Sequence, residues 1–150
     1  MKTLAEIASF LDADGRASGF VQLHHSDIGG LATEGEPAAV ANVLVQRWGY
    51  SAISPLSWSL IDRASAAEIA CRLLSADLAY KSELLSAKTA AYAGECLVVA
   101  LSKFQARFLC NAEFRGTSMT WDPIGQSTFE AALVGFDGTQ AFLLYADAED

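Results

Sequence analysis

The stretch TFEAALVGFDGTQAFLLYA, residues 128–146, decides the fold class of this 150-residue chain. Two largely apolar runs, 128–136 and 139–146, flank the dipeptide Asp137-Gly138. This dipeptide tolerates the positive φ angles of a tight hairpin turn. The pattern predicts a β-hairpin at the end of the chain, with its tightest turn at Asp137-Gly138.

Residues 104–115 predict a further strand upstream of the hairpin. Every second residue from Phe104 to Phe114 is apolar, polar residues lie between them, and Leu109 is the one exception. This is the period of a strand with one buried face. A turn at Gly116 and a short strand at 119–121 follow, so we expect an antiparallel sheet of about four strands.

Helical patterns gather before the sheet. Residues 3–11 carry apolar side chains at helical spacing, and Thr3 with Glu6 forms a capping box. Pro37 fits the first position of a second helix, and Gly49 fits the left-handed position just after its end. The sequence therefore predicts two helices in the first third of the chain.

A longer helical pattern runs from residue 65 to residue 103, opened by a second capping box, Ser65 with Glu68. One straight helix of this length would span about 58 Å, roughly twice the span of a small domain. The pattern must therefore break. We expect one break near residues 80–82 and a weak point at Gly94.

Four segments are less regular. Residues 20–25 fit either a strand or a continuation of apolar packing, and residues 96–101 fit either a buried helix or a short strand. Residues 26–36 are rich in glycine and polar residues, which is typical of a mobile loop. Residues 50–61 are expected to be irregular because Pro55 disfavours helix before itself, with Trp58 and Leu60 anchored in the core.

Helices that precede consecutive antiparallel strands predict an α+β fold, a single domain over residues 1–150 with its N-terminal helices on one face of the sheet. The strands of the hairpin carry large apolar groups toward both faces, including the aromatics Phe136 and Tyr145. The second face therefore needs either a partner or a further layer from the chain's own helices.

The charge of the chain restricts its partners. Eighteen acidic against ten basic residues give a formal net charge of −8. This charge repels nucleic acid and anionic membranes and favours a basic protein. There is no apolar signal-peptide core and no run long enough for a membrane span, so we expect a soluble, cytoplasmic protein.

No catalytic or metal-binding motif is present in the sequence. The cysteines Cys71, Cys96 and Cys110 lie far apart among apolar neighbours, which predicts buried thiols and neither a metal nor a cofactor. His24 and His25 are adjacent, so a strand would point them to opposite faces. Asp122 and Glu130 could form a carboxylate pair across the sheet, although their spacing does not require it.

The C-terminal strands combine aromatic and acidic residues. We expect Trp121 and Tyr145 to act as apolar anchors, with carboxylates around them that steer a basic partner. The acids concerned are Asp122, Asp147 and Glu149, together with Asp150 in the tail.

This surface predicts a small acidic protein-binding module. Its most concrete form is a bacterial immunity or antitoxin protein that neutralises a basic toxin such as a nuclease, and a homodimer is compatible with the same surface. The alternative is a small enzyme or ligand-binding domain that uses residues 24–36 with His24 or His25.

Overall fold

A computed structural model describes residues 1–149 and confirms the α+β class; Asp150 lies outside the described residues. The helices are α1 (Leu4–Ala13), α2 (Pro37–Arg47), α3 (Arg63–Ser75) and α4 (Ala87–Val99), with short 3₁₀ turns η1 (Ala17–Gly19) and η2 (Pro55–Ser57). The strands are β1 (Val21–Asp27), β2 (Ser59–Ile61), β3 (Arg107–Cys110), β4 (Ala112–Arg115), β5 (Ser118–Trp121), β6 (Phe129–Phe136) and β7 (Gln140–Ala148).

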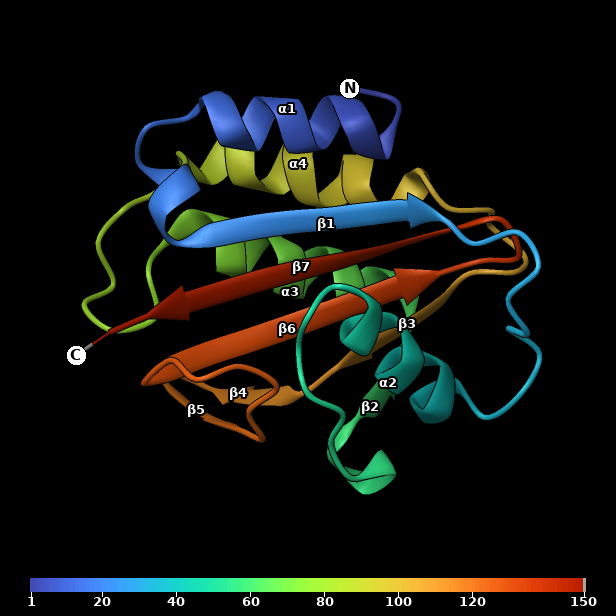
Figure 1. Cartoon of the computed structure of the whole chain (residues 1–150). Coiled ribbons are helices and arrows are strands. Elements are labelled where there is room, and N and C mark those ends of the chain that lie inside the picture. Colours follow the sequence, from blue (N-terminus) through green and yellow to red (C-terminus); the bar gives the residue numbers. More distant parts are fainter. Residues whose placement is uncertain (150) are drawn as a thin grey trace.

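Five strands form one antiparallel sheet in the order β1-β7-β6-β3-β2, and β4 and β5 form a separate two-stranded hairpin. Of the segment 20–25, which the sequence left open, residues 21–25 belong to strand β1, which pairs with β7 at the sheet edge. The chain thus returns its N-terminal strand to the side of its C-terminal strand (Figure 1).

Helices cover both faces of the sheet. In Figure 1, α1, α3 and α4 lie on one side of the strands and α2 on the other. Leu133 and Leu144 belong to the first of two apolar clusters, whereas Val134 and Leu143 belong to the second, with α2. This explains the unbroken apolar runs, because a strand buried on both faces does not alternate. The chain's own α2 is therefore the further layer over the second face.

The strand predicted over 104–115 is shorter and broken. Phe104 is 88% exposed, and the ladder starts only at Arg107. Asn111 separates β3 from β4, and its side chain accepts a hydrogen bond from Ala132 N–H at 2.7 Å. Leu109 departs from the alternation because it packs with the α2 cluster on the second face.

The hairpin β6–β7 is confirmed, but its turn works differently from the prediction. The φ angle of Gly138 lies outside the left-handed region. The carboxylate of Asp137 instead accepts backbone N–H groups from Thr139 at 2.8 Å and Gln140 at 2.9 Å. It also accepts the N–H of Ser102 at 2.8 Å, which ties the turn to the segment after α4. The side chain of Asp137 organises this turn.

The ends of α1 and α2 follow the sequence pattern. The Thr3 hydroxyl accepts the N–H of Glu6 at 3.1 Å, which satisfies one of the free donors at the start of α1. Helix α2 has Pro37 at its first position, and Gly49 after its end adopts a φ of +91°.

Helix α3 begins earlier than predicted, because Asp62 and not Ser65 caps it. It ends at Ser75, ahead of the expected break. Gly94 is not a weak point: it lies inside α4, where an added Cβ would stand 3.0 Å from the carbonyl oxygen of Ala67 in α3. The glycine allows the two helices to approach closely.

The remaining segments divide between core and surface. Residues 96–99 belong to α4, so the first of the two alternatives for 96–101 is correct there. Trp58 is buried as predicted, and its indole N–H donates to Asn42 at 2.9 Å. Leu60 is 58% exposed, so its predicted place in the core is wrong. None of the helices within residues 1–149 has the length and apolar character needed to span a bilayer.

Candidate functional site

The predicted binding residues Trp121, Asp147 and Glu149 lie at one end of the sheet but not all on one face. The Trp121 ring packs on the apolar cluster of α1, α3 and α4, which also holds Ala148. Asp147 precedes Ala148 in β7 and therefore points to the opposite face, the one that α2 covers. Trp121 ends β5, and its ring lies 5.6 Å from that of Phe129, the first residue of β6. Phe129 in turn pairs with Ala148, which lies between Asp147 and Glu149 in the sequence. Figure 1 shows the β4–β5 hairpin beside the start of β6, near the C-terminus.

Three carboxylates belong to this end. The Asp147 carboxylate accepts the Ser127 hydroxyl at 2.7 Å, and the exposed Glu149 accepts the hydroxyl and N–H groups of Thr128. Asp122 follows Trp121 directly and is exposed. Hydroxyl and amide donors hold the side chains of Asp147 and Glu149 in place without neutralising their charge.

Within residues 1–149 the one ion pair closer than 4.0 Å joins Arg115 to Glu113 at 3.5 Å. The three carboxylates therefore have no cationic side chain of their own chain in contact. Carboxylates without a cation in contact attract a cationic partner over a Debye length of about 8 Å at physiological salt.

Tyr145 is not part of this surface, because it is only 4% exposed. Its hydroxyl donates to Glu130 at 3.1 Å, and its ring lies 4.6 Å from that of Tyr50. Burial and the neighbouring Glu130 carboxylate raise the pKa of Tyr145 well above its usual range. The prediction that Tyr145 is exposed is wrong, and the Phe136 ring is likewise only 1% exposed. Both rings lie on the face of the sheet that α2 covers.

Phe20 supplies an aromatic side chain that the sequence analysis missed. It is 37% exposed, and its carbonyl oxygen accepts the N–H of Asp147 at 3.0 Å. The pairing of β1 with β7 brings it there. No local pattern shows which distant strand residue 20 will join, so the sequence offered no sign of this neighbour. We name the following set the acidic edge: Phe20, Trp121, Asp122, Phe129, Asp147 and Glu149.

Glu130 beneath this surface is fully buried and serves the fold. Its carboxylate accepts the N–H groups of Ile124 at 2.8 Å and Gly125 at 2.9 Å. Asn111 Nδ2 and the Tyr145 hydroxyl complete the set at 3.2 and 3.1 Å. No hydrogen bond within the described chain joins this carboxylate to that of Asp122. The residue anchors the loop before β6.

The histidines lie on opposite sides of β1, as predicted. His24 is half-buried: its Nε2 lies 2.9 Å from the Tyr50 hydroxyl and its ring is stacked 6.0 Å from that of Trp48. Burial, with a smaller contribution from His25, lowers the pKa of His24. His25 is exposed. Over residues 1–149 there is no cluster of three or more His, Cys, Asp or Glu side chains suited to a metal ion.

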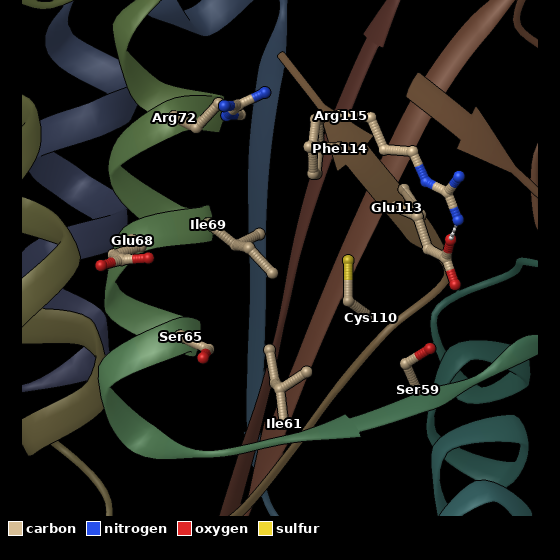
Figure 2. A pocket seen from close by; sticks show the side chains of 11 residues that line it. Ser59, Ile61, Ser65, Glu68, Ile69, Arg72, Cys110, Glu113, Phe114 and Arg115 are labelled. Atoms are coloured by element: carbon tan, nitrogen blue, oxygen red, sulfur yellow. Dashed lines mark hydrogen bonds and ion pairs between the residues drawn. The ribbon is translucent and has the colours of Figure 1, made fainter. Parts of the chain in front are cut away.

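A groove of about 520 Å³ lies between α3 and β4, the strand that pairs with β5. Figure 2 shows Ile69 of α3 and Ile61 of β2 directed into it, with Phe114 of β4 on its far wall. The guanidinium carbon of Arg72 stands 4.7 Å from the centre of the Phe114 ring. We call this cavity the α3 groove.

Cys110 also borders the α3 groove but is 1% exposed, and burial raises the pKa of its thiol to about 11. Cys96 is buried as predicted, whereas Cys71 is only partly buried. All three are free thiols.

The candidate site therefore rests on geometry alone: carboxylates and aromatic side chains at one end of a sheet. Comparisons of the chain with protein-family models, with curated proteins and with solved structures found no match.

Proposed function

We propose that this chain is a small acidic binding module that neutralises a basic protein in the cytoplasm, in the manner of a bacterial immunity or antitoxin protein. The observation that carries the proposal is the acidic edge: Asp122, Asp147 and Glu149 lie at the same end of the sheet as the partly buried rings of Trp121 and Phe129, and no cationic side chain of residues 1–149 lies within 4.0 Å of these carboxylates.

A nuclease toxin is the partner class that this surface fits best. Its active site must present positive charge to phosphate, so an acidic protein that covers it gains both association rate and complementarity. The formal net charge of −8 adds a long-range attraction toward a positively charged partner. The proposal assigns no catalytic step to the chain.

The alternative, a ligand site in residues 24–36, has weaker support. Tyr50 and Trp48 already occupy the hydrogen-bonding and stacking surfaces of His24. His25 is exposed on the other side of the strand, so the two imidazoles do not converge on one ligand.

The test uses the protein encoded by the adjacent open reading frame, purified as the candidate partner. Its association with the wild-type chain is compared with that of the triple variant Asp122→Asn, Asp147→Asn, Glu149→Gln. We expect association to slow by roughly tenfold and its salt dependence to flatten, because electrostatic steering acts mainly on the association rate.

A matched control removes three exposed acids elsewhere, with Asp12→Asn, Glu34→Gln and Glu95→Gln. It makes the same change in net charge away from the acidic edge, so it should slow association far less. Equal effects of the two triple variants would show that only net charge matters. A confirmed complex whose rates neither variant changes would place the interface elsewhere.

A further inference from the structure

Strand β4 has an unpaired edge. Within the described residues it pairs with β5 alone. The backbone N–H of Asn111 donates to Ala132 of β6, and its carbonyl oxygen accepts the N–H of Asp122, both at 3.2 Å. The N–H and C=O groups of one strand residue point to the same side, so β5 lies on the β6 side of the chain. The opposite edge of β4 is free.

The free edge of β4 lies on the same side of the chain as β2. Ser59 pairs with Cys110, so a longer β2 would run on past Asn111 toward Ala112 and Glu113. The chain turns away instead, because the buried Trp58 bonds to Asn42 and η2 precedes it. Alternation along the β4–β5 ladder directs the N–H and C=O groups of Phe114 toward the free edge.

A groove lies on each side of this edge. The α3 groove is on one face. Its large apolar side chains are Ile61, Ile69 and Phe114, and charged side chains also line it (Figure 2): Glu68, Arg72, Glu113 and Arg115. A second groove of about 250 Å³ is lined by Leu56, Ser59 and Thr120, and its charged lining residues are Glu113 and Asp122. We call it the Asp122 groove. Ala112 and Glu113 border both grooves, so the edge lies between them.

We propose that the free edge of β4 binds an extended segment of the basic partner as an added strand, with apolar side chains in the α3 groove and lysine or arginine side chains in the Asp122 groove. Successive residues of a strand point to opposite faces. This suits one groove that offers large apolar side chains and one whose charged lining residues are acidic. This inference rests on the proposed function and names how the partner is held.

The charges favour such a segment over a second copy of the chain. Two copies of β4 paired antiparallel about a two-fold axis would place their Glu113 side chains on the same face. Carboxylates placed together in this way repel. A basic segment meets Glu113 and Asp122 with opposite charge, and the exposed Arg115 ion pair competes weakly with it.

The test is an NMR titration of the ¹⁵N-labelled full chain with a short, end-blocked peptide that alternates lysine and valine. We expect saturable shifts of the amide signals of β4 and of Ser59. A peptide with glutamate in place of lysine should leave these signals unchanged. The double variant Glu113→Gln, Asp122→Asn should weaken binding by roughly fivefold, whereas Asp12→Asn with Glu34→Gln should not.

Two N-methylated versions test backbone pairing, one methylated at every lysine and one at every valine. Only one set of N–H groups faces β4, so one version should lose binding and the other should keep it. Binding by both versions would overturn strand addition. β4 shifts that depend on protein concentration without peptide would identify a second copy as the occupant and overturn the proposal.

The outcomes separate this inference from the proposed function. Lysine-dependent shifts confined to Asp147 and Glu149 would support the acidic edge but overturn pairing at β4. Shifts confined to β1, an edge strand of the five-stranded sheet, would overturn pairing at β4. Equal binding of the glutamate and lysine peptides at β4 would overturn the basic character assigned to the segment here.

Discussion

Asn111 Nδ2 donates a hydrogen bond of 3.2 Å to Oε2 of Glu130, and both residues are buried. The same amide group donates to the Asp122 carbonyl at 2.9 Å, while Asn111 Oδ1 accepts from Ala132 N–H. This contact holds the bend between β3 and β4 against β6. The free edge of β4 and the position of Asp122 both depend on it.

Glu130→Gln should destabilise the protein by about 2–4 kcal/mol, because an amide NH₂ replaces an oxygen and leaves a buried N–H group unpaired. Urea denaturation measures the loss. Glu149→Gln serves as the control, since its side chain is exposed and its loss of charge should change the free energy of unfolding by less than about 0.5 kcal/mol. Equal stability of wild type and Glu130→Gln would contradict the assigned anchoring role.

Asp137→Ala should destabilise the hairpin by about 2 kcal/mol or more, because several backbone donors lose their acceptor. Gly138→Ala should cost much less, since its φ is not left-handed and the nearest atom to an added Cβ is the flexible Gln105 side chain at 3.3 Å. Thermal melts of the two variants give the comparison. A larger loss of stability for Gly138→Ala than for Asp137→Ala would show that the glycine, and not the Asp137 carboxylate, determines the turn.

Stability should fall on acidification below about pH 4. Burial alone would raise the pKa of Asp77 and of Asp137, but backbone N–H donors outweigh it and hold both pKa values below the ordinary 3.8. A lowered pKa in the folded state gives stability that is present above the unfolded-state value and is lost as pH falls through the folded-state value. Urea titrations from pH 6 to pH 2 measure this loss. A double variant Asp77→Asn, Asp137→Asn should be less stable at pH 6 and show a flatter decline; an unchanged slope would assign acid unfolding to other carboxyls.

Gly94→Val should destabilise the protein by about 2–4 kcal/mol, because the side chain meets backbone atoms of α3 at 3.0–3.1 Å. Glu95→Val, at the exposed neighbouring position of α4, provides the control. Chemical denaturation compares them. If both variants lose the same amount, helix propensity and not the contact with α3 explains Gly94.

Trp121→Ala should speed dissociation of the confirmed partner by roughly tenfold, as expected for an aromatic anchor at an interface. Tyr145→Phe should leave dissociation unchanged, because Tyr145 is buried, while it lowers stability by removing the hydrogen bond to Glu130. Surface plasmon resonance gives the rates and thermal melts give the stabilities. If only Tyr145→Phe speeds dissociation, Tyr145 contributes to the binding surface and Trp121 does not.

The sequence by itself determined the α+β class, the β6–β7 hairpin, the start of α1 and both ends of α2. These features depend on neighbours in sequence: Thr3 reaches Glu6, and Gly49 adopts its φ of +91° within one turn of the helix end. The place of Trp121 at the same end of the sheet as Asp147 and Glu149 was not determined in this way, because β5 belongs to a separate two-stranded hairpin and not to the sheet that holds β7.

Only the tertiary structure decided which face each apolar residue uses and what covers it. The pattern around Tyr145 is apolar on both sides, and periodicity cannot distinguish a second layer of helix from a partner protein. The place of β1 beside β7, and with it Phe20 beside Asp147, depends on pairing across more than a hundred residues. The bend at Asn111 likewise depends on Glu130, Ala132 and Asp122, which reach it only after the sheet has formed.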